Sequence, residues 1–229
     1  MYIKDISHAL SIMGHKIDVI SGPPYPNLAK QVKLIKLPGL DLFQTFLFKE
    51  RLKIFFSKKN KKVIDYYEFL STLLGGFPEM RTFGFRAKNH LKNNDYDIII
   101  DNQSLSYGVL DLQKENPLIE IVHHPITKDY EHELETNNKF LYKLSRHRWY
   151  SFLKMQKKVA PKLQTIVTPS INSLKDIAAD FHCDPKKITV INNGLDIDIF
   201  IPHNNIERRK FRLITTASAD VPLKGLDYS

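Results

Sequence analysis

Residues 95–103 read DYDIIIDNQ, and this stretch decides the fold class. Its three consecutive isoleucines, Ile98 to Ile100, show no polar alternation, which is typical of a strand covered on both faces in a parallel sheet. Helical spacing over residues 80–92 precedes the stretch, and a second helical segment over residues 107–114 follows it. Because parallel strands are joined by helical crossovers, this order predicts an α/β fold.

The alternation of strands and helices extends along most of the chain. Gly14 is expected to end the first helix in a left-handed conformation, and Ser170 to cap a helix that runs to Phe181. Further strands are predicted at 17–21, 32–37, 118–122, 165–168, 188–191 and 213–216, and further helices at 2–13, within 40–74 and at 139–159. We therefore expect a doubly wound, mainly parallel α/β sheet, followed by the first strand and helix start of a second domain.

The composition limits the class of protein. Of 229 residues, 42% are hydrophobic, enough for a core, yet no run approaches the roughly 18 apolar residues that suggest a membrane span. The first residues lack the apolar core of a cleavable signal peptide, and Cys183 has no second cysteine to pair with. These features predict a cytoplasmic protein, working in solution or at the cytoplasmic face of the membrane.

The net charge of +9 is unevenly placed. Residues 30–62 contain ten Lys and Arg residues but two acids, together with aromatic residues that include Phe48, Phe55 and Phe56. Such a mixture is first expected to be a solvated basic face over a helix whose rings point into the core, and the next alternative is binding to an anionic membrane surface. Nucleic acid is not an expected partner, because no recognition motif accompanies the charge.

Polar residues follow several of the predicted strands, where ligands of doubly wound sheets bind. Asn102 and Gln103 carry amides that suit a hydroxyl-rich ligand, although such residues also form turns and caps. His123 and His124 follow the next strand, and Pro125 holds the chain out of the helical region there. Adjacent histidines point apart and no other Cys/His cluster is present, so no metal site is expected.

The ordered set of motifs resembles the family-four, or group 1, retaining glycosyltransferases. These have the GT-B fold, in which two Rossmann-like domains face each other across a cleft. The motifs that carry the resemblance are Gly14-His15, the strand at 17–21, SGxPYP from Ser21 to Pro26, Phe77-Pro78-Glu79, Asp101-Asn102-Gln103, HHPIT from His123 to Thr127, Arg148-Trp149-Tyr150, NGLDxxxFxP from Asn193 to Pro202, and Pro222-Leu223-Lys224-Gly225. Each motif is weak alone, whereas their order over the whole chain is specific.

The resemblance implies the transfer of a sugar from a nucleotide-diphosphate sugar to a glycan or lipid acceptor, with retention at the anomeric carbon. By position, His123 is the residue that contacts the transferred sugar, and it is the implied catalytic residue. Asn102, Gln103 and His124 are the candidates for binding the acceptor.

On the donor side, Lys224 matches the lysine that binds the diphosphate in this family, and Ser218 stands where an arginine is usual. A lysine at a helix start suits a leaving group on which negative charge builds up. Neither a metal nor another cofactor is expected, because the lysine and the helix ends supply the positive potential.

The resemblance also implies a domain organisation. Residues 1–201 form the acceptor-side domain, residues 202–210 a linker, and residues 211–229 the beginning of the donor-binding domain. Members of the family begin with a strand and a glycine-rich loop before their first helix, and they carry a glutamate pair in the second domain; this sequence shows neither. The expectation is an inactive fragment of a transferase, and the alternative is a non-catalytic Rossmann-like module that binds a ligand or a partner.

Overall fold

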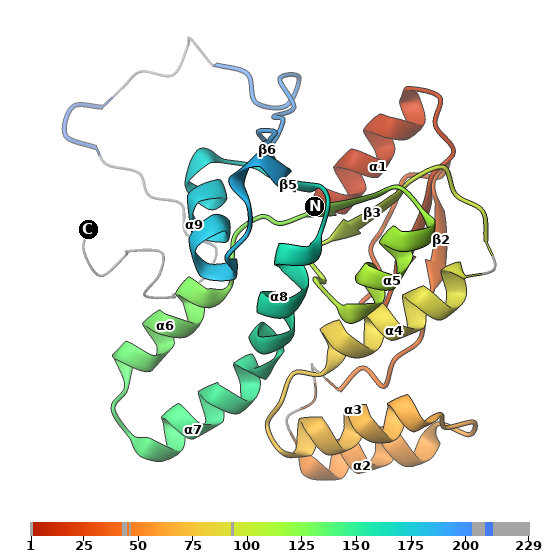
Figure 1. The fold of residues 1–229 in the computed structure, drawn as a ribbon, viewed down its shortest axis with the longest axis vertical. Coiled ribbons are helices and arrows are strands. Elements are labelled where there is room, and N and C mark those ends of the chain that lie inside the picture. The colour runs from red at the N-terminus through yellow and green to blue at the C-terminus, as the bar shows by residue number, and fades with distance from the viewer. Residues whose placement is uncertain (1, 43–44, 46, 93, 203–208, 213–229) are drawn as a thin grey trace.

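The computed structural model describes residues 2–42, 45, 47–92, 94–202 and 209–212. Helices and strands alternate through this part of the chain, as Figure 1 shows. The helices are α1 (Tyr2–Ile12), α2 (Phe48–Ser57), α3 (Val63–Leu73), α4 (Glu79–Leu91), α5 (Tyr107–Glu115), α6 (Thr127–Thr136), α7 (Phe140–Trp149), α8 (Leu153–Val159) and α9 (Ile171–Phe181). The predicted strand at 213–216, Ser218 and Lys224 lie outside the described residues.

The strands form two parallel sheets. Strands β1 (Asp18–Ser21) and β2 (Lys33–Lys36) make the first, and β3 (Ile99–Asn102), β4 (Leu118–Ile121), β5 (Ile166–Thr168) and β6 (Ile188–Val190) follow one another in the second. Every pairing in the described residues is parallel. The predicted parallel α/β class is confirmed, although the described strands divide between two sheets rather than lying in one.

Two helix ends behave as the sequence predicts. The Ser170 hydroxyl accepts a hydrogen bond of 3.0 Å from the Ser173 amide, so it caps α9. Gly14, two residues beyond α1, has a φ of 95°, which is the left-handed conformation that glycine adopts most readily. The predicted helix over 139–159 is broken into α7 and α8 by a short 3₁₀ segment, Tyr150–Phe152.

The expectation that the isoleucines of residues 98–100 are covered on both faces is wrong. Ile98 and Ile100 are 47% and 41% exposed, and only Ile99 packs against the main core. The reason is the position of β3, which within the described residues pairs with β4 alone and therefore forms an edge of its sheet. An unbroken apolar run shows that a strand is present, but its burial depends on which neighbours it finds.

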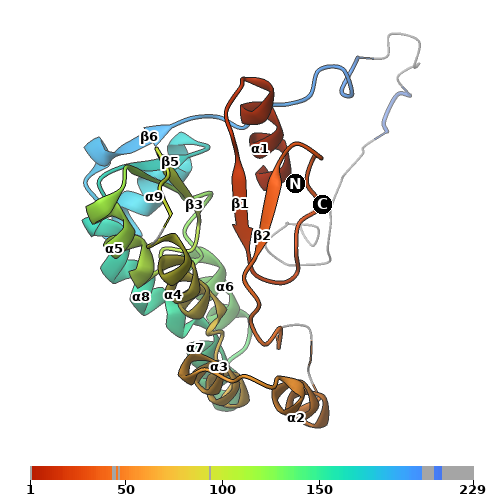
Figure 2. The ribbon, with the colours of Figure 1, turned by 90° about the vertical axis from the view of Figure 1, so that its right-hand side faces the viewer.

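The main core lies between the four-stranded sheet and the helices α5, α8 and α9. Val122 and Val159, with Ile177 and Phe181 of α9, are fully buried there. In Figure 2 these helices lie on one side of the strands, and α1 lies beside β1 and β2. Burial of about 25 cal/mol per Å² of apolar surface makes this core the main stabilising contribution to the sheet that carries the candidate site.

Helices α2 and α3 pack together away from the strands (Figures 1 and 2). The aromatic residues of α2 divide between the two alternatives given for residues 30–62, since some rings are buried and others are exposed. Phe55 is buried and stacks on Phe69 of α3 with ring centroids 4.2 Å apart, as the alternative of core-facing rings predicts. Phe48 and Phe56, in contrast, are exposed, and the Lys61 ammonium lies 5.9 Å from the ring of Phe56. Within the described residues, no helix is both long and apolar enough to cross a membrane.

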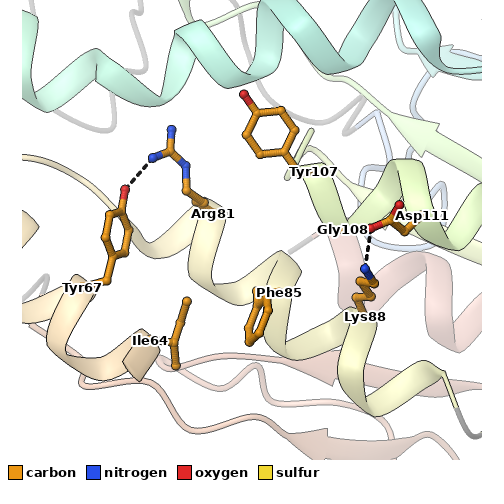
Figure 3. Close-up of a pocket in the computed structure, with 8 residues that line it drawn as sticks. All are labelled: Ile64, Tyr67, Arg81, Phe85, Lys88, Tyr107, Gly108 and Asp111. Carbon is orange, nitrogen blue, oxygen red and sulfur yellow. Dashed lines mark hydrogen bonds and ion pairs between the residues drawn. The ribbon is translucent and has the colours of Figure 1, made fainter. Parts of the chain in front are cut away.

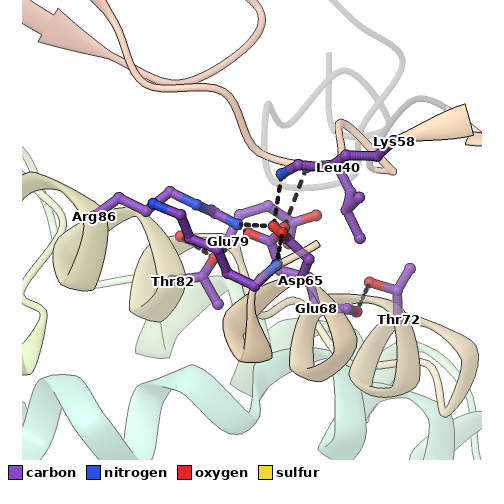
Figure 4. Close-up of polar contacts among 9 residues, drawn as sticks. Leu40, Lys58, Asp65, Glu68, Thr72, Glu79, Thr82 and Arg86 are labelled. Atoms are coloured by element: carbon purple, nitrogen blue, oxygen red, sulfur yellow. Dashed lines mark hydrogen bonds and ion pairs between the residues drawn. The ribbon is translucent and has the colours of Figure 1, made fainter. Parts of the chain in front are cut away.

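A set of buried charges joins α3 and α4, and Figure 4 shows their contacts. The guanidinium of Arg86 bridges two carboxylates, Glu68 at 2.5 Å and Asp65 at 3.0 Å. Asp65 also receives Lys58 at 2.7 Å, and Glu68 accepts a 3.2 Å hydrogen bond from the Leu40 amide. We call these residues the Arg86 network; it ties the loop before α2 to the two helices.

The pKa values of the carboxyl groups in and beside this network depend on whether each one has a cationic partner. Burial by itself would raise the pKa of Asp65, but the hydrogen bonds and charges of Lys58 and Arg86 outweigh it and lower that pKa. The outcome for Glu79, at the start of α4, is the opposite. Burial, strengthened by the negative charge of Glu68, raises the pKa of Glu79 to about 7.

Candidate functional site

The carboxyl ends of β3 and β4 bring together polar side chains that are distant in sequence. In the register of the two strands, Asn102 lies opposite Ile121, and His123 follows two residues later. The imidazole Nε2 of His123 lies 3.0 Å from the amide oxygen Oδ1 of Asn102. In this orientation the ring nitrogen donates to the amide oxygen, so one hydrogen bond links the two strand ends.

The amide of Gln103 clamps the two strand ends through their backbones. Its Oε1 accepts from the His123 amide at 3.1 Å, and its Nε2 donates to the carbonyl of His124 at 3.0 Å. Gln103 has a φ of 64°, and Leu105 in the same loop has a φ of 45°. Such left-handed conformations are uncommon for residues other than glycine and cluster at functional sites.

The carboxylate of Asp101 stabilises the loop that follows β3 through hydrogen bonds to Ser104. It accepts hydrogen bonds of 2.9 Å from both the amide and the hydroxyl of Ser104. Opposite it in the strand register lies Glu120, which is fully buried. Burial, the negative charge of Asp101 and hydrogen bonding to it raise the pKa of Glu120 well above its usual range. The fold therefore favours the protonated form of Glu120 beside the Asp101 carboxylate.

The imidazole of His123 is neutral at physiological pH. Burial, with a smaller contribution from the charge of His124, lowers its pKa. The ring of Tyr2 meets it edge to face at 4.6 Å, and the Ser173 hydroxyl donates to the His123 carbonyl at 2.9 Å. Among the described residues Nδ1 of His123 has no hydrogen-bond partner, which leaves it available to a ligand.

His124 is directed elsewhere. Its Nε2 forms an exposed contact of 3.3 Å with Asp129 of α6, whereas the ring of His123 contacts Asn102. The two histidines therefore have separate partners, as their adjacency predicts. In the part of the chain that the structure describes, no three His, Cys, Asp or Glu residues are grouped so that they could hold a metal ion.

The turn after β6 has a structural explanation. The carboxylate of Asp196 accepts hydrogen bonds from the amides of Asp198 and Ile199 at 3.0 and 3.3 Å, as expected for a residue that caps a short segment. Asn192 donates from its side chain to the Pro169 carbonyl at 2.9 Å and so connects the ends of β6 and β5. These contacts do not involve the groups around His123.

The structure thus groups three of the sequence-predicted residues, Asn102, Gln103 and His123, whereas the side chain of His124 contacts Asp129 and only its carbonyl meets Gln103. The sequence did not indicate a role for Glu120 or Ser173. Glu120 lies opposite Asp101 in the strand register, and Ser173 donates a hydrogen bond to the His123 carbonyl. The available signal for Glu120 was a single acidic residue in an otherwise apolar strand, LIEIV at residues 118–122. Such a residue in a buried strand must be neutralised or paired.

A parallel α/β sheet with uncharged hydrogen-bonding groups at its carboxyl edge defines a class of proteins that bind polar ligands at strand ends. A family model described as Glycosyltransferase Family 4 matches residues 1–199, and the chain belongs to this family.

A similar protein is the "MMP alpha-(1->4)-mannosyltransferase" of Mycolicibacterium hassiacum. It is 39% identical to this chain over 232 residues, which cover 100% of the chain. The chain spans 55%, about half, of the length of that relative.

Proposed function

We propose that the protein takes part in transferring a sugar from a nucleotide-diphosphate sugar to a glycan or lipid acceptor, with retention at the anomeric carbon. The observation that carries this proposal is the neutral His123, held by Asn102 at the carboxyl edge of the sheet in a chain of the glycosyltransferase family. The relative is a mannosyltransferase, which favours a mannosyl donor.

The geometry suits binding of a sugar more than acid–base chemistry on a charged group. Because Nε2–H of the neutral His123 ring donates to Asn102, Nδ1 carries no proton and can accept one hydrogen bond from a sugar hydroxyl. Asn102 fixes the ring from its other nitrogen, and Gln103 fixes the backbone. In this proposal His123 contacts the transferred sugar, while Gln103 acts as a positioning residue. Asn102 and His124 have exposed side chains that an acceptor can reach.

The donor diphosphate is assigned to residues beyond the described part of the chain. Lys224 supplies the positive charge in this proposal, with Ser218 in place of the usual arginine, and no metal or other cofactor takes part. Because the chain spans about half of its relative, we propose that transfer requires a donor domain beginning near residue 211, and that the 229-residue chain alone binds the donor weakly. Excess EDTA should then leave the activity of the full-length protein unchanged.

The test is the His123→Ala variant of the full-length protein, assayed with a panel of nucleotide sugars by product formation and by calorimetry. We expect loss of at least a hundredfold in transfer, with an unchanged circular dichroism spectrum and retained nucleotide binding. Turnover equal to wild type in His123→Ala removes this residue from the mechanism. Nucleotide-sugar or glycan binding without any turnover in the wild-type protein would support the non-catalytic module instead.

A second proposal concerns location. Phe48 and Phe56 are exposed on α2, and Lys61 lies 5.9 Å from the ring of Phe56. Exposed rings beside lysines suit the headgroup region of an anionic membrane. Sedimentation with vesicles should show binding that requires anionic lipid and decreases in Phe56→Ala; equal pelleting with neutral vesicles contradicts the electrostatic contribution.

The third proposal concerns the domain itself. Strands β1 and β3 each pair on one side only within the described residues, and Tyr96, just before β3, donates to Asp18 of β1 at 3.0 Å. We propose that a further parallel strand lies between β1 and β3 and joins the two sheets, covering the exposed Ile98 and Ile100. Hydrogen exchange on the longest polypeptide of the gene should then show protected amides along both facing edges; fast exchange along β3 would contradict this arrangement.

A further inference from the structure

A pocket of about 320 Å³ opens on the outer helical layer, between α3, α4 and α5. Its floor is a stripe of α4 formed by Arg81, Phe85 and Lys88, at the spacing that places side chains on one face of a helix. Tyr67 of α3 and Tyr107 of α5 are among the residues that form its sides (Figure 3). None of these residues belongs to the group around His123.

Close backbone packing joins α4 and α5, two of the helices that line the pocket. A Cβ atom on Gly84 of α4 would lie 1.8 Å from the Ser106 hydroxyl, and one on Gly108 of α5 would lie 2.3 Å from the Gly84 carbonyl. The two helices therefore approach each other as closely as glycine permits. The aromatic neighbours of these glycines, Phe85 and Tyr107, line the same pocket with 49% and 45% of their surfaces exposed.

Polar groups stand at the two ends of the aromatic surface, as Figure 3 shows. At one end Arg81 donates from Nη1 to the Tyr67 hydroxyl at 2.5 Å, while its buried Nε has no hydrogen-bond partner within the described residues. At the other end Lys88 and Asp111 form an ion pair of 2.5 Å. The pocket thus offers aromatic rings in the middle, with donors at both ends and an acceptor at one.

This arrangement matches a saccharide better than an acyl chain. A pyranose has apolar C–H faces that pack on aromatic rings, and hydroxyl groups around its edge that need hydrogen-bond partners. An acyl chain would leave Arg81, Lys88 and Asp111 without solvent and without new partners, which is costly. The volume is at the lower end of the range of small-ligand sites, about 300–1,000 Å³, and suits one or two sugar units.

We propose that the pocket between α3, α4 and α5 is an accessory glycan-binding site, which holds a segment of a carbohydrate chain away from the bond that is made. The choice of a glycan rests on the proposed function, because a transferase that extends a polymer meets its product at high local concentration. Phe85 and Tyr107 stack on the sugar faces. Arg81, Lys88 and Asp111 bind the hydroxyl groups.

The test is binding of an α-1,4-linked mannotetraose to the full-length protein, measured by saturation-transfer NMR and calorimetry. We expect the dissociation constant to rise at least tenfold in Phe85→Ala and in Tyr107→Ala, and to stay within twofold in the ring-retaining Tyr107→Phe. Phe140→Ala is the matched control, because Phe140 is an exposed aromatic residue of α7 outside the pocket. Circular dichroism of each variant monitors folding.

Several outcomes overturn the site: no oligosaccharide binding, binding unchanged by both alanine substitutions, or binding of lauric acid or lipid vesicles that depends on Phe85. The His123→Ala variant separates this inference from the proposed function. It should lose transfer but retain mannotetraose binding that is sensitive to Phe85. Normal transfer together with mannotetraose binding that does not depend on Phe85 would contradict the accessory site but not the proposed function. Mannotetraose binding that depends on Phe85, in a wild-type protein without any transfer activity, would contradict the proposed function but not the accessory site.

Discussion

The Arg86 network and the strand-end site around His123 both gather buried or half-buried polar groups, but they do so in opposite ways. In the network, the charges of Asp65, Glu68 and Arg86 are buried and paired with one another. At the strand ends, His123 is neutral, the fold favours the protonated form of Glu120, and Asn102 carries an amide. The comparison shows that stability and ligand binding use different polar groups in this chain. Buried charges that are paired with one another hold the helices together, whereas uncharged groups that still have a free hydrogen-bonding position can bind a ligand.

The largest expected effect comes from breaking the pairing in the network. Arg86→Met removes the cation from two buried carboxylates, so we expect a loss of about 3–5 kcal/mol in the free energy of unfolding, measured by chemical denaturation. The matched control is Lys114→Met, because Lys114 forms an exposed pair with Asp111 that is worth about 0–1 kcal/mol. Equal losses in the two variants would show that the network is not a stabilising element.

Glu79 provides a pH test of the same region. Its pKa is about 7 in the folded protein and ordinarily 4.5, so above pH 4.5 the unfolded chain ionises first. The raised pKa of Glu79 should therefore lower the stability between pH 4.5 and 7 by about 3 kcal/mol, in addition to any change that Glu120 contributes. Glu79→Gln should remove that fall in pH-dependent denaturation. The lowered pKa of Asp65 acts only below its ordinary value of 3.8, so it does not interfere; an unchanged pH profile contradicts the assignment.

Glu120 extends this test to the strand-end site. Its pKa is raised, so it binds a proton in the folded state that the unfolded chain loses above about pH 4.5, and its contribution to stability decreases as the pH rises. Glu120→Gln keeps the hydrogen-bond donor and should be at least as stable as wild type at pH 8. If Glu120→Gln is instead destabilised most strongly at pH 8, Glu120 is ionised in the fold and its pKa is not raised.

The smallest effect on stability, with a clear effect on function, is expected at Asn102. It is an exposed residue with one hydrogen bond to His123, so Asn102→Ala should cost about 1 kcal/mol or less in unfolding free energy. Transfer by the full-length protein should fall at least tenfold, because the ring of His123 loses its fixed orientation. A loss of stability comparable to that of Arg86→Met would place Asn102 with the structural residues and erase the contrast between the two regions.

Local features of the sequence determined the parts of the fold that depend on neighbours along the chain. The cap of α9 by Ser170 and the turn at Gly14 need only residues a few positions away, which is why they follow directly from the sequence. The strand-end positions of Asn102 and His123 follow as well, because parallel strands end at a common edge. The helical crossovers between those strands likewise follow from the alternation of periodic segments.

Only the tertiary structure decided the features that depend on contacts distant in sequence. The exposure of Ile98 and Ile100 depends on which strand lies beside β3, and the raised pKa of Glu120 depends on its register with Asp101. The Glu68 carboxylate accepts from the amide of Leu40, 28 positions away, and Gly108 packs against the backbone of Gly84. A sequence lists the polar and small residues, but the free energy of burying them depends on the partners that folding brings within reach.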